Sequence, residues 1–416
     1  MSFKLLRQGL NRSKAPQPMW TAKEMQDSYD VVIIGGGAHG LACAYYLAKN
    51  YGITNVAVME KSYIGSGGSG RNTTIIRSNY LTPEGVSFYN ESVKLYEEMS
   101  AEFDFNVMFS QRGHFTLAHS DSAVRTMRRR AEVNQIQGVD SRFVTPDEIK
   151  AICPAIDISD HPRYPIMGAL YHPPGGIIRH DAVVWGYAHH ADRMGVHIHQ
   201  QTEVTDIEVQ DNKVTGVHIN QGSKHQFVKT GMVLNATAGW CSIISDMAGV
   251  KLPITTFPLQ ACVSEPLKPF LDTVIVSGSL HVYISQSDRG ELVMGASVDP
   301  FASYNIRGSL AFTEGIAGHL LELFPSLSHV RILRQWAGLC DMTPDYSPVM
   351  GFTEVEGFVV DVGWGTYGFK ASPVSGKRMA ELIATNRTPD LLYPFRPSRF
   401  SEFDLVGEKG AASVGH

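Results

Sequence analysis

Three glycines and one acidic residue near the N-terminus have the spacing of a nucleotide-binding turn. Gly35, Gly37 and Gly40 follow the apolar run "VVII", and Glu60 stands about 20 residues after the last of them. The glycines permit a tight turn, close approach to a pyrophosphate and close helix–strand packing. The Glu60 carboxylate can accept hydrogen bonds from ribose hydroxyls, and its charge disfavours the 2′-phosphate of NADP. We therefore predict a dinucleotide site, to which we also assign Ala38, His39 and Lys61.

The segments around these residues have the periodicity that such a turn requires. "DVVIIGGG" at 30–37 predicts a short buried strand, because its run of β-branched residues stops at glycines. "LACAYYLAK" has helical spacing, and "NVAVMEK" predicts the next strand. The N-terminus of the helix would offer unpaired N–H groups and a partial positive charge to the phosphates. This spacing alone does not separate FAD from NAD.

Two later segments favour FAD. "GSGGSGRNTTIIRSNY" at 65–80 comes where flavoproteins of the glutathione-reductase type run a loop along the cofactor. "GFVVDVGWGTYGFK" at 357–370 predicts a strand, a glycine turn and a helix, which would be a second approach to the flavin, although a plain strand–turn–helix is the alternative. Together with the glycine loop that ends the stretch "MVLNATAGW", these segments supply the predicted contacts Arg71, Asn72, Thr73, Gly239, Gly363, Gly365, Thr366, Gly368 and Lys370.

Composition excludes several classes of protein. The 416 residues are 43% hydrophobic and 19% charged, and the net charge of −5 argues against a nucleic-acid partner. The five cysteines stand singly, which argues against a disulfide framework or a metal site and suits a reducing compartment. No apolar run is long enough to span a bilayer, so we expect a cytoplasmic protein.

The order of the predicted elements indicates an α/β protein with two interleaved domains. Residues 30–110, 175–250 and 346–400 would form a Rossmann-like FAD-binding domain. Residues 111–174 and 251–345 would form a substrate domain with a largely antiparallel sheet, and the catalytic pocket should lie between the two. "RTMRRR" at 125–130 is interpreted as a solvated helix face rather than an anion site.

Both ends of the chain lie outside these domains. Residues 1–29 form an N-terminal extension, in which "FKLLRQGL" could fold into one or two amphipathic turns. Docking of this segment on a partner protein is expected ahead of membrane contact or a frayed end. Residues 401–416 are expected to be a C-terminal tail.

An ordered series of segments resembles the β subunit of heterotetrameric sarcosine oxidase, in the amine-oxidising branch of FAD enzymes. The series runs from residue 29 to about residue 400 and includes "RNTTIIRSNY", "FSQRG", "RYPIMGA", "RHDAVVWGYA", "HVYISQ", "GELVMGA" and "GWGTYGFK". The resemblance implies two flavins. Non-covalent FAD would oxidise the substrate amine. FMN would be attached covalently to His180 of "RHD" and would pass electrons onward, in the oxidase to O₂. From the residues alone, the alternative is an N-cap-type residue just ahead of a helix that starts at Asp181.

Monomeric relatives instead attach FAD to a cysteine in a segment that ends in "TPD". In this chain the segment is "RQWAGLCDMTPD", and the position in register with that cysteine is Gly338, two residues before Cys340. We therefore expect no bond between Cys340 and FAD.

The resemblance also implies a reaction and its residues. A hydride equivalent would leave the carbon next to a secondary amine, and the iminium would be hydrolysed or captured by a folate carrier, so that sarcosine gives glycine and a one-carbon unit. Lys370 matches the family lysine near the flavin, although a surface lysine is the alternative. His281 and Tyr283 are two residues apart, so they should share one face of a strand and line the substrate pocket, or else belong to the core. Arg77 could reach the flavin or the substrate carboxylate.

Departures from the family pattern leave the substrate open. Tyr367 stands where the family commonly has glycine, and a bulky side chain there could change the size of the substrate. Another secondary amino acid, such as N-methylglutamate or proline, with another electron acceptor is one alternative. A flavin-binding assembly protein without turnover is a second, against which Lys370, His281 and His180 argue. The resemblance implies partner subunits that carry NAD, folate and zinc sites.

Overall fold

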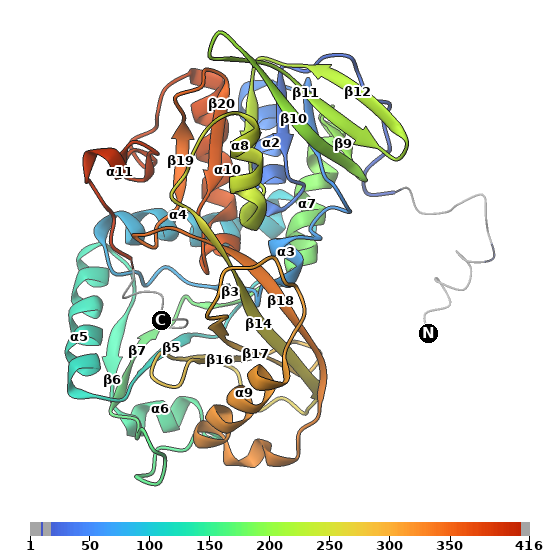
Figure 1. The fold of residues 1–416 in the computed structure, drawn as a ribbon. Coiled ribbons are helices and arrows are strands. Elements are labelled where there is room, and N and C mark those ends of the chain that lie inside the picture. Colours follow the sequence, from blue (N-terminus) through green and yellow to red (C-terminus); the bar gives the residue numbers. More distant parts are fainter. Residues whose placement is uncertain (1–9, 11–17, 409–416) are drawn as a thin grey trace.

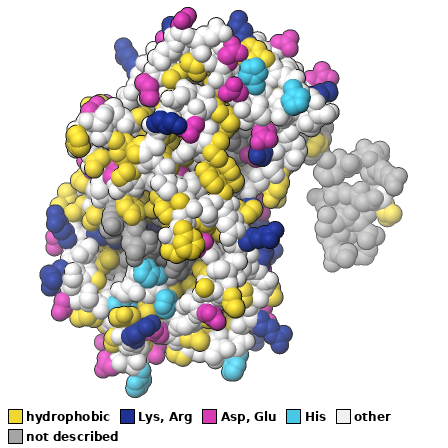
Figure 2. Space-filling view, viewed as in Figure 1, with side chains coloured by type: hydrophobic (Ala, Val, Ile, Leu, Met, Phe, Trp, Pro, Cys, Tyr) yellow, Lys and Arg dark blue, Asp and Glu magenta, His cyan; other side chains and the backbone are white. Residues whose placement is uncertain are grey.

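The computed structural model describes residue 10 and residues 18–408, apart from the side chains of residues 296 and 297. The chain forms two lobes, each built on one large sheet (Figure 1). Hydrophobic side chains gather on the surface at the waist between them (Figure 2). Among the described residues, no helix combines the length and the apolar character needed to cross a membrane.

The sheet of the first lobe is parallel except at one edge. Its strands are β1 (Val31–Ile34), β2 (Val56–Met59), β9 (His197–His199), β13 (Val233–Asn235), β19 (Val349–Phe352) and β20 (Phe358–Val362), in the order β19-β20-β13-β1-β2-β9. Only the β19–β20 pair is antiparallel. The central strands β1 and β2 are continuous apolar runs because other elements cover both faces of the sheet.

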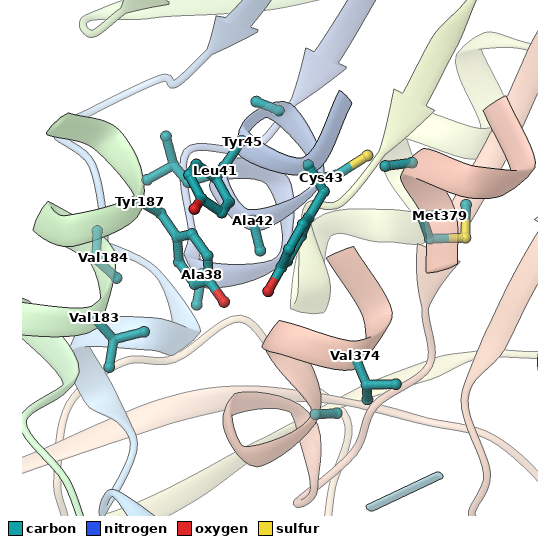
Figure 3. Packing of buried hydrophobic residues seen from close by; sticks show 14 of the residues in the cluster. Ala38, Leu41, Ala42, Cys43, Tyr45, Val183, Val184, Tyr187, Val374 and Met379 are labelled. Carbon is teal, nitrogen blue, oxygen red and sulfur yellow. The ribbon is translucent and has the colours of Figure 1, made fainter. Parts of the chain in front are cut away.

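Helices cover one face of this sheet. They are α2 (Ala38–Tyr51), α7 (His180–Arg193) and α10 (Gly368–Thr385), and α2 packs between the other two (Figure 3). Tyr45 faces Tyr187 of α7, with ring centroids 5.5 Å apart. On the α10 side, a Cβ on Gly376 would collide with Ala42, so glycine lets these two helices come close together. The opposite face of the sheet carries α8 (Cys241–Met247) and the three-stranded sheet β10 (Thr202–Gln210), β11 (Lys213–Gln221) and β12 (Lys224–Lys229).

The second lobe contains an eight-stranded, mostly antiparallel sheet. Its strands are β5 (His114–Ala118), β6 (Arg142–Val144), β7 (Gly168–His172), β14 (Thr255–Pro266), β15 (Val274–Ser277), β16 (Val282–Gln286), β17 (Glu291–Val298) and β18 (Ile332–Met342), in the order β18-β14-β17-β16-β15-β5-β7-β6. Only β5 and β15 are parallel. The helices of this lobe are α5 (Asp121–Ile136), α6 (Pro146–Ile152) and α9 (Leu310–Leu323).

A small sheet and several short elements complete the fold. The small sheet has the order β3 (Ile75–Ile76), β8 (Gly176–Ile177), β4 (Ser110–Gln111). The remaining elements are α3 (Gly68–Arg71), α4 (Pro83–Glu102), α11 (Arg399–Glu402) and the 3-10 turns η2 (Ala238–Trp240), η3 (Pro325–His329) and η4 (Tyr393–Phe395). The predicted α/β fold class is confirmed. The domain limits stay a prediction; the strands of the second large sheet come from residues 114–172 and 255–342.

The interpretation of "RTMRRR" as a solvated face is wrong for its last residue. Arg130 is fully buried, together with Met127, Ala131 and Asn134 of α5. These positions are spaced i, i+3, i+4 and i+7, so they form the helix stripe that packs against β5 and β7. Arg130 therefore points into the protein, where it donates a hydrogen bond to the carbonyl oxygen of Asn79.

The described parts of both chain ends pack against the lobes. Lys23 donates to the carbonyl oxygen of Val196 at 2.8 Å and forms an ion pair with Asp192 at 3.3 Å. The predicted partner contact at residues 3–10 lies, except for residue 10, outside the described residues. At the other end, the expected tail is docked as far as Glu408. The buried Glu408 carboxylate accepts hydrogen bonds from Leu81 and Thr82 at the N-terminus of α4, where negative charge is favourable.

Candidate active site

A cavity of about 680 Å³ lies between the two large sheets. Gly35 and Glu60 line it where β1 and β2 end, and Lys370 lines it at the start of α10. Tyr283 of β16 lines it from the second lobe. The cavity thus joins residues that are more than 300 positions apart in the sequence.

The predicted glycine turn forms one end of this cavity. Gly35 has a φ of 112°, which favours glycine, and α2 begins at Ala38 without a side-chain cap from Gly37. A Cβ on Gly40 would collide with the carbonyl oxygen of Gly35, so Gly40 shapes the turn from behind and does not line the cavity. Glu60 accepts hydrogen bonds from the N–H groups of Gly36 at 3.0 Å and Ser62 at 2.8 Å, which fix its carboxylate at the cavity wall.

The loop after Glu60 runs along the cavity as predicted. Arg71, Asn72 and Thr73 line it, and so does Lys61, whose largely exposed side chain pairs with Glu203 at 2.6 Å. The indole N–H of Trp336 in β18 donates to the Arg71 carbonyl oxygen at 2.8 Å, which ties this loop to the second lobe.

The second glycine segment contributes only part of its residues to the cavity wall. Gly365, Thr366 and Gly368 line the cavity, whereas Gly239 and Gly363 do not. A Cβ on Gly239 would collide with Leu339, and one on Gly363 would press on Thr343. Both glycines are therefore packing positions beside the cavity rather than parts of its wall.

His39 connects the two glycine segments. Its side chain lines the cavity, and its Nε2 lies 2.8 Å from the Gly368 carbonyl oxygen. Its Nδ1 lies 3.1 Å from a carboxylate oxygen of Asp361, which is buried at the end of β20. These two contacts hold the start of α2 against the start of α10.

Arg77 and Lys370 bring positive charge to one end of the cavity. The Lys370 ammonium lies 3.5 Å from the Thr366 carbonyl oxygen and 5.7 Å from the ring centroid of Tyr367. Burial, and secondly the nearby Arg77 guanidinium, hold the pKa of Lys370 well below its usual 10.5. Arg77 donates to the Asn79 side-chain oxygen at 3.0 Å and lies over the Tyr80 ring. This end of the cavity is suited to a carboxylate ligand.

The structure separates His281 from Tyr283. The expectation that they share one strand face is wrong, because β16 begins at Val282 and His281 has a φ of 47° in the preceding turn. Tyr283 lines the cavity and His281 does not. The turn instead places His281 near His319 of α9.

His180 is the first residue of α7 and does not line the cavity. It is nevertheless close to the cavity wall through the small sheet. Ile177 pairs with Ile75, and the N–H of Ile178 donates to the Thr74 carbonyl oxygen at 3.2 Å, where both Thr74 and Ile75 line the cavity. Burial lowers the pKa of His180.

Residues 30–382 match the family described as FAD dependent oxidoreductase. The chain belongs to that family. It is 46% identical to a sarcosine oxidase subunit beta from Arthrobacter sp. over 96% of this chain and 98% of the relative. It is 44% identical to the one from Rhodobacter capsulatus, over 100% and 99%. A solved L-proline dehydrogenase from P. horikoshii is 30% identical and superposes with a TM-score of 0.86 over 92% of this chain and 100% of that structure. The resemblance drawn from the sequence is confirmed.

The cavity of this FAD dependent oxidoreductase fits its cofactor. The start of α2, where Ser69 accepts a hydrogen bond from the Ala38 N–H, would hold phosphates through the N–H groups of its first turn, and the Glu60 carboxylate would hold a ribose. The wall then continues through Arg71–Thr73 to the Gly365–Lys370 segment. Cys340 also lines the cavity, and burial raises the pKa of its thiol to about 12, which disfavours the nucleophilic thiolate.

Sequence reasoning missed several polar residues of the cavity wall, among them Ser69, Asp341 and His114. Ser69 accepts a hydrogen bond from Ala38 at the start of α2, at 2.9 Å. Asp341 is buried and accepts a hydrogen bond from the Gly363 N–H at 2.6 Å, and burial raises its pKa to about 6. His114 opens β5. For His114 a signal existed, since the alternation in "HFTLAH" places it on the face opposite Phe115 and Leu117.

Proposed function

We propose that this chain oxidises sarcosine to an iminium, which yields glycine and a one-carbon unit, as the catalytic subunit of a multi-subunit oxidase. The observation that carries this proposal is the pair of buried cations, Arg77 and Lys370, at the end of the cavity that Tyr283 also lines. The 44–46% identity to sarcosine oxidase β subunits supports the same substrate.

The residues of this site would bind and orient the substrate. When bound, FAD supplies the acceptor for the hydride equivalent that leaves the carbon next to the amine. Arg77 and Lys370 would hold the carboxylate and so fix the position of that carbon. They would also disfavour a protonated amine, because a third positive charge beside two buried cations is unfavourable. The amine is therefore bound in its neutral form, which is the form that can be oxidised.

Anaerobic addition of sarcosine to the purified protein, with any subunits that copurify, tests this proposal. Rapid loss of flavin absorbance is the expected result. The similarity to L-proline dehydrogenase makes proline the second candidate substrate, so proline is tested in parallel. If only proline or N-methylglutamate bleached the flavin, that amino acid would be the substrate in place of sarcosine, and the proposed oxidation of a secondary amine would stand. No bleaching by any of them, with stable partner binding, would indicate an assembly protein.

We further propose that FMN is attached covalently to His180 and that the FAD is not covalently bound. Ile177 and Ile178, just before His180, contact Ile75 and Thr74 of the cavity wall, which supports an attachment point near the FAD cavity. The ion pair between Arg179 and Asp181 flanks the site. Partner subunits would carry the NAD, folate and zinc sites. Full activity of the isolated chain would contradict the proposal that it needs these subunits.

Acid precipitation tests the two-flavin arrangement. We expect FAD in the supernatant and FMN on the peptide that contains His180, detected by the mass of that peptide. In His180→Asn the covalent flavin should be absent while the FAD content is unchanged, and His189→Asn, farther along α7, serves as the control. Unmodified His180 in the wild-type protein would contradict the proposal.

A further inference from the structure

One buried histidine of the cavity wall has no partner for its ring nitrogens. His114 is 1% exposed and lines the cavity. Neither Nδ1 nor Nε2 forms a hydrogen bond with any residue that the structure describes. Because buried polar side chains almost always have a partner, the ring is left to bond with what enters the cavity.

The strand that carries His114 aims its side chain at the same end of the cavity as Tyr283. In β5, Phe115 and Leu117 enter the apolar core of the second lobe, so His114 lies on the other face. His114 is opposite Val274 in β15, and Val276, two residues on, is opposite Tyr283 in β16. His114, Val276 and Tyr283 all line the cavity, so three neighbouring strands present one wall.

Burial, together with the nearby positive charges, favours the neutral form of the His114 ring. Burial, and next the nearby Arg77 and His172, lower its pKa well below the usual 6.5, and Arg130 and Lys370 act in the same direction. A neutral imidazole has one N–H donor and one acceptor nitrogen. We call Arg77, His114 and Lys370 the cationic end of the cavity.

Among the described residues, the buried carboxylate that acts on Arg130 is that of Glu408. It already accepts hydrogen bonds from the N–H groups of Leu81 and Thr82 and from the Thr82 hydroxyl. Glu408 does not line the cavity. The cationic end therefore presents positive charge and a hydrogen-bond donor to a carboxylate that enters the cavity.

We infer that His114 binds the substrate carboxylate, to which its neutral imidazole donates a hydrogen bond beside Arg77 and Lys370. This inference rests on the proposed function and adds a third residue to the carboxylate site. A neutral donor strengthens carboxylate binding without adding to the repulsion between the two buried cations. His114 should therefore affect affinity for the substrate more than the rate of the bound complex.

Two substitutions at His114 and one matched control test this inference. His114→Leu removes the hydrogen bond, and His114→Asn keeps a donor of smaller size. Thr116→Val is the control, because Thr116 lies two residues on along the same face of β5, is buried, and does not line the cavity. Thermal midpoint and FAD content identify variants that fold.

The measurement is the dissociation constant of acetate from the change in flavin absorbance, followed by KM and kcat for sarcosine. In His114→Leu we expect the dissociation constant of acetate and the KM for sarcosine to rise about ten- to a hundredfold, with kcat changed much less. His114→Asn should recover part of the affinity, and Thr116→Val should stay within about twofold of the wild type.

Unchanged acetate affinity in a folded His114→Leu variant would overturn the inference, and so would a wild-type protein that does not bind acetate. Acetate binding needs no turnover. If sarcosine failed to bleach the wild-type flavin, only the proposed substrate would fail, and the acetate series would still decide the role of His114.

Discussion

Replacing Lys370 with methionine is expected to lower kcat/KM for the amine substrate about a hundredfold or more. Lys370 is buried, lines the cavity and lies within electrostatic reach of Arg77. Removing one partner of a buried, charge-assisted contact costs several kcal/mol, because the other partner stays desolvated. In the proposed function that partner is the substrate carboxylate. Anaerobic rapid-mixing measurement of flavin reduction against substrate concentration checks the prediction.

The pH dependence of ligand binding gives Lys370 a second signature. Its pKa is well below the usual 10.5 in the free protein, and a bound carboxylate stabilises the ammonium and raises that pKa. Binding therefore takes up a proton wherever Lys370 is neutral in the free protein, so affinity falls as the pH rises through its free-protein pKa. In Lys370→Met this dependence should disappear.

A neighbouring lysine of the same helix supplies the control. Lys377 of α10 has a partly exposed side chain, pairs with Glu91 at 3.5 Å and does not line the cavity. Lys377→Met should leave flavin reduction within about twofold of the wild type. Equal rates in Lys370→Met and Lys377→Met would remove Lys370 from the proposed machinery.

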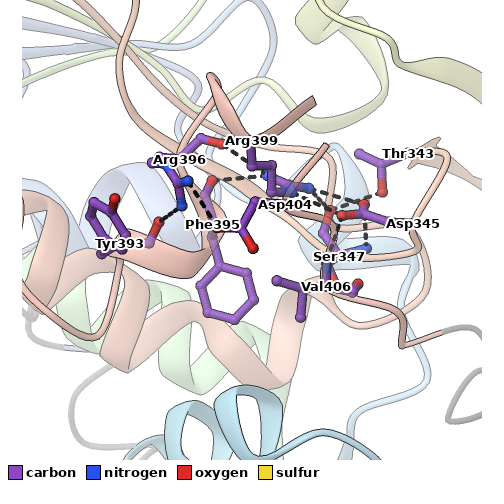
Figure 4. Close-up of polar contacts among 9 residues, drawn as sticks. All are labelled: Thr343, Asp345, Ser347, Tyr393, Phe395, Arg396, Arg399, Asp404 and Val406. Carbon is purple, nitrogen blue, oxygen red and sulfur yellow. Dashed lines mark hydrogen bonds and ion pairs between the residues drawn. The ribbon is translucent and has the colours of Figure 1, made fainter. Parts of the chain in front are cut away.

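Replacing Arg399 with methionine is expected to reduce the free energy of unfolding by about 3–5 kcal/mol. The Arg399 guanidinium makes two hydrogen bonds to the Asp345 carboxylate, at 2.8 and 3.0 Å, and both side chains are buried (Figure 4). It also donates to the Ser347 carbonyl oxygen at 2.9 Å. Methionine would leave a buried carboxylate without its cation. Equilibrium urea denaturation of the FAD-loaded protein measures the change.

The nearby Arg396 provides a matched comparison. Its guanidinium pairs with Glu402 and Asp404, whose side chains are largely exposed. Figure 4 shows Arg396 beside Asp404. Surface pairs contribute little, so Arg396→Met should cost about 1 kcal/mol or less. The Asp345→Asn, Arg399→Met double variant should be less destabilised than the sum of the single variants, because neither charge is then left alone. If the changes in unfolding free energy of the two single variants simply added up, the Arg399–Asp345 ion pair would not be the cause of the destabilisation.

The Arg399–Asp345 ion pair is also connected to the wall of the cofactor cavity. Asp345 accepts a hydrogen bond from the Val406 N–H, and Ser347 donates to the Val406 carbonyl oxygen, so the segment around Val406 is fixed to the 343–347 loop. Thr343 of the same loop packs against Gly363, at the base of the segment that leads to Lys370. Arg399→Met is therefore expected to weaken FAD retention as well as stability.

The nucleotide-binding half of the site was predictable because its signals are local. The strand before Gly35, the helix after it and Glu60 at the end of the next strand lie within about 30 residues. Each feature follows from short-range rules for turns and apolar periodicity. The lining positions around residues 71–73 and 365–370 came from the same kind of glycine-rich pattern and from the family resemblance.

The substrate half was decided by pairings between distant strands. His114 faces the cavity because β5 lies between β7 and β15, which places residue 114 opposite residues 172 and 274. Arg130 is buried because α5 packs over those strands, whereas its composition suggested a solvated face. His281 does not line the cavity, because it lies with a positive φ in the turn before β16.

The sequence by itself determined that the chain contains a dinucleotide-binding turn, which family the protein belongs to and which segments approach the cofactor. Only the tertiary structure decided which charged and polar side chains meet at the cationic end of the cavity. The physical reason is that period-two and period-3.6 patterns specify which residues share a face of an element. They do not specify which other element that face will meet, because that depends on packing between segments more than 100 residues apart.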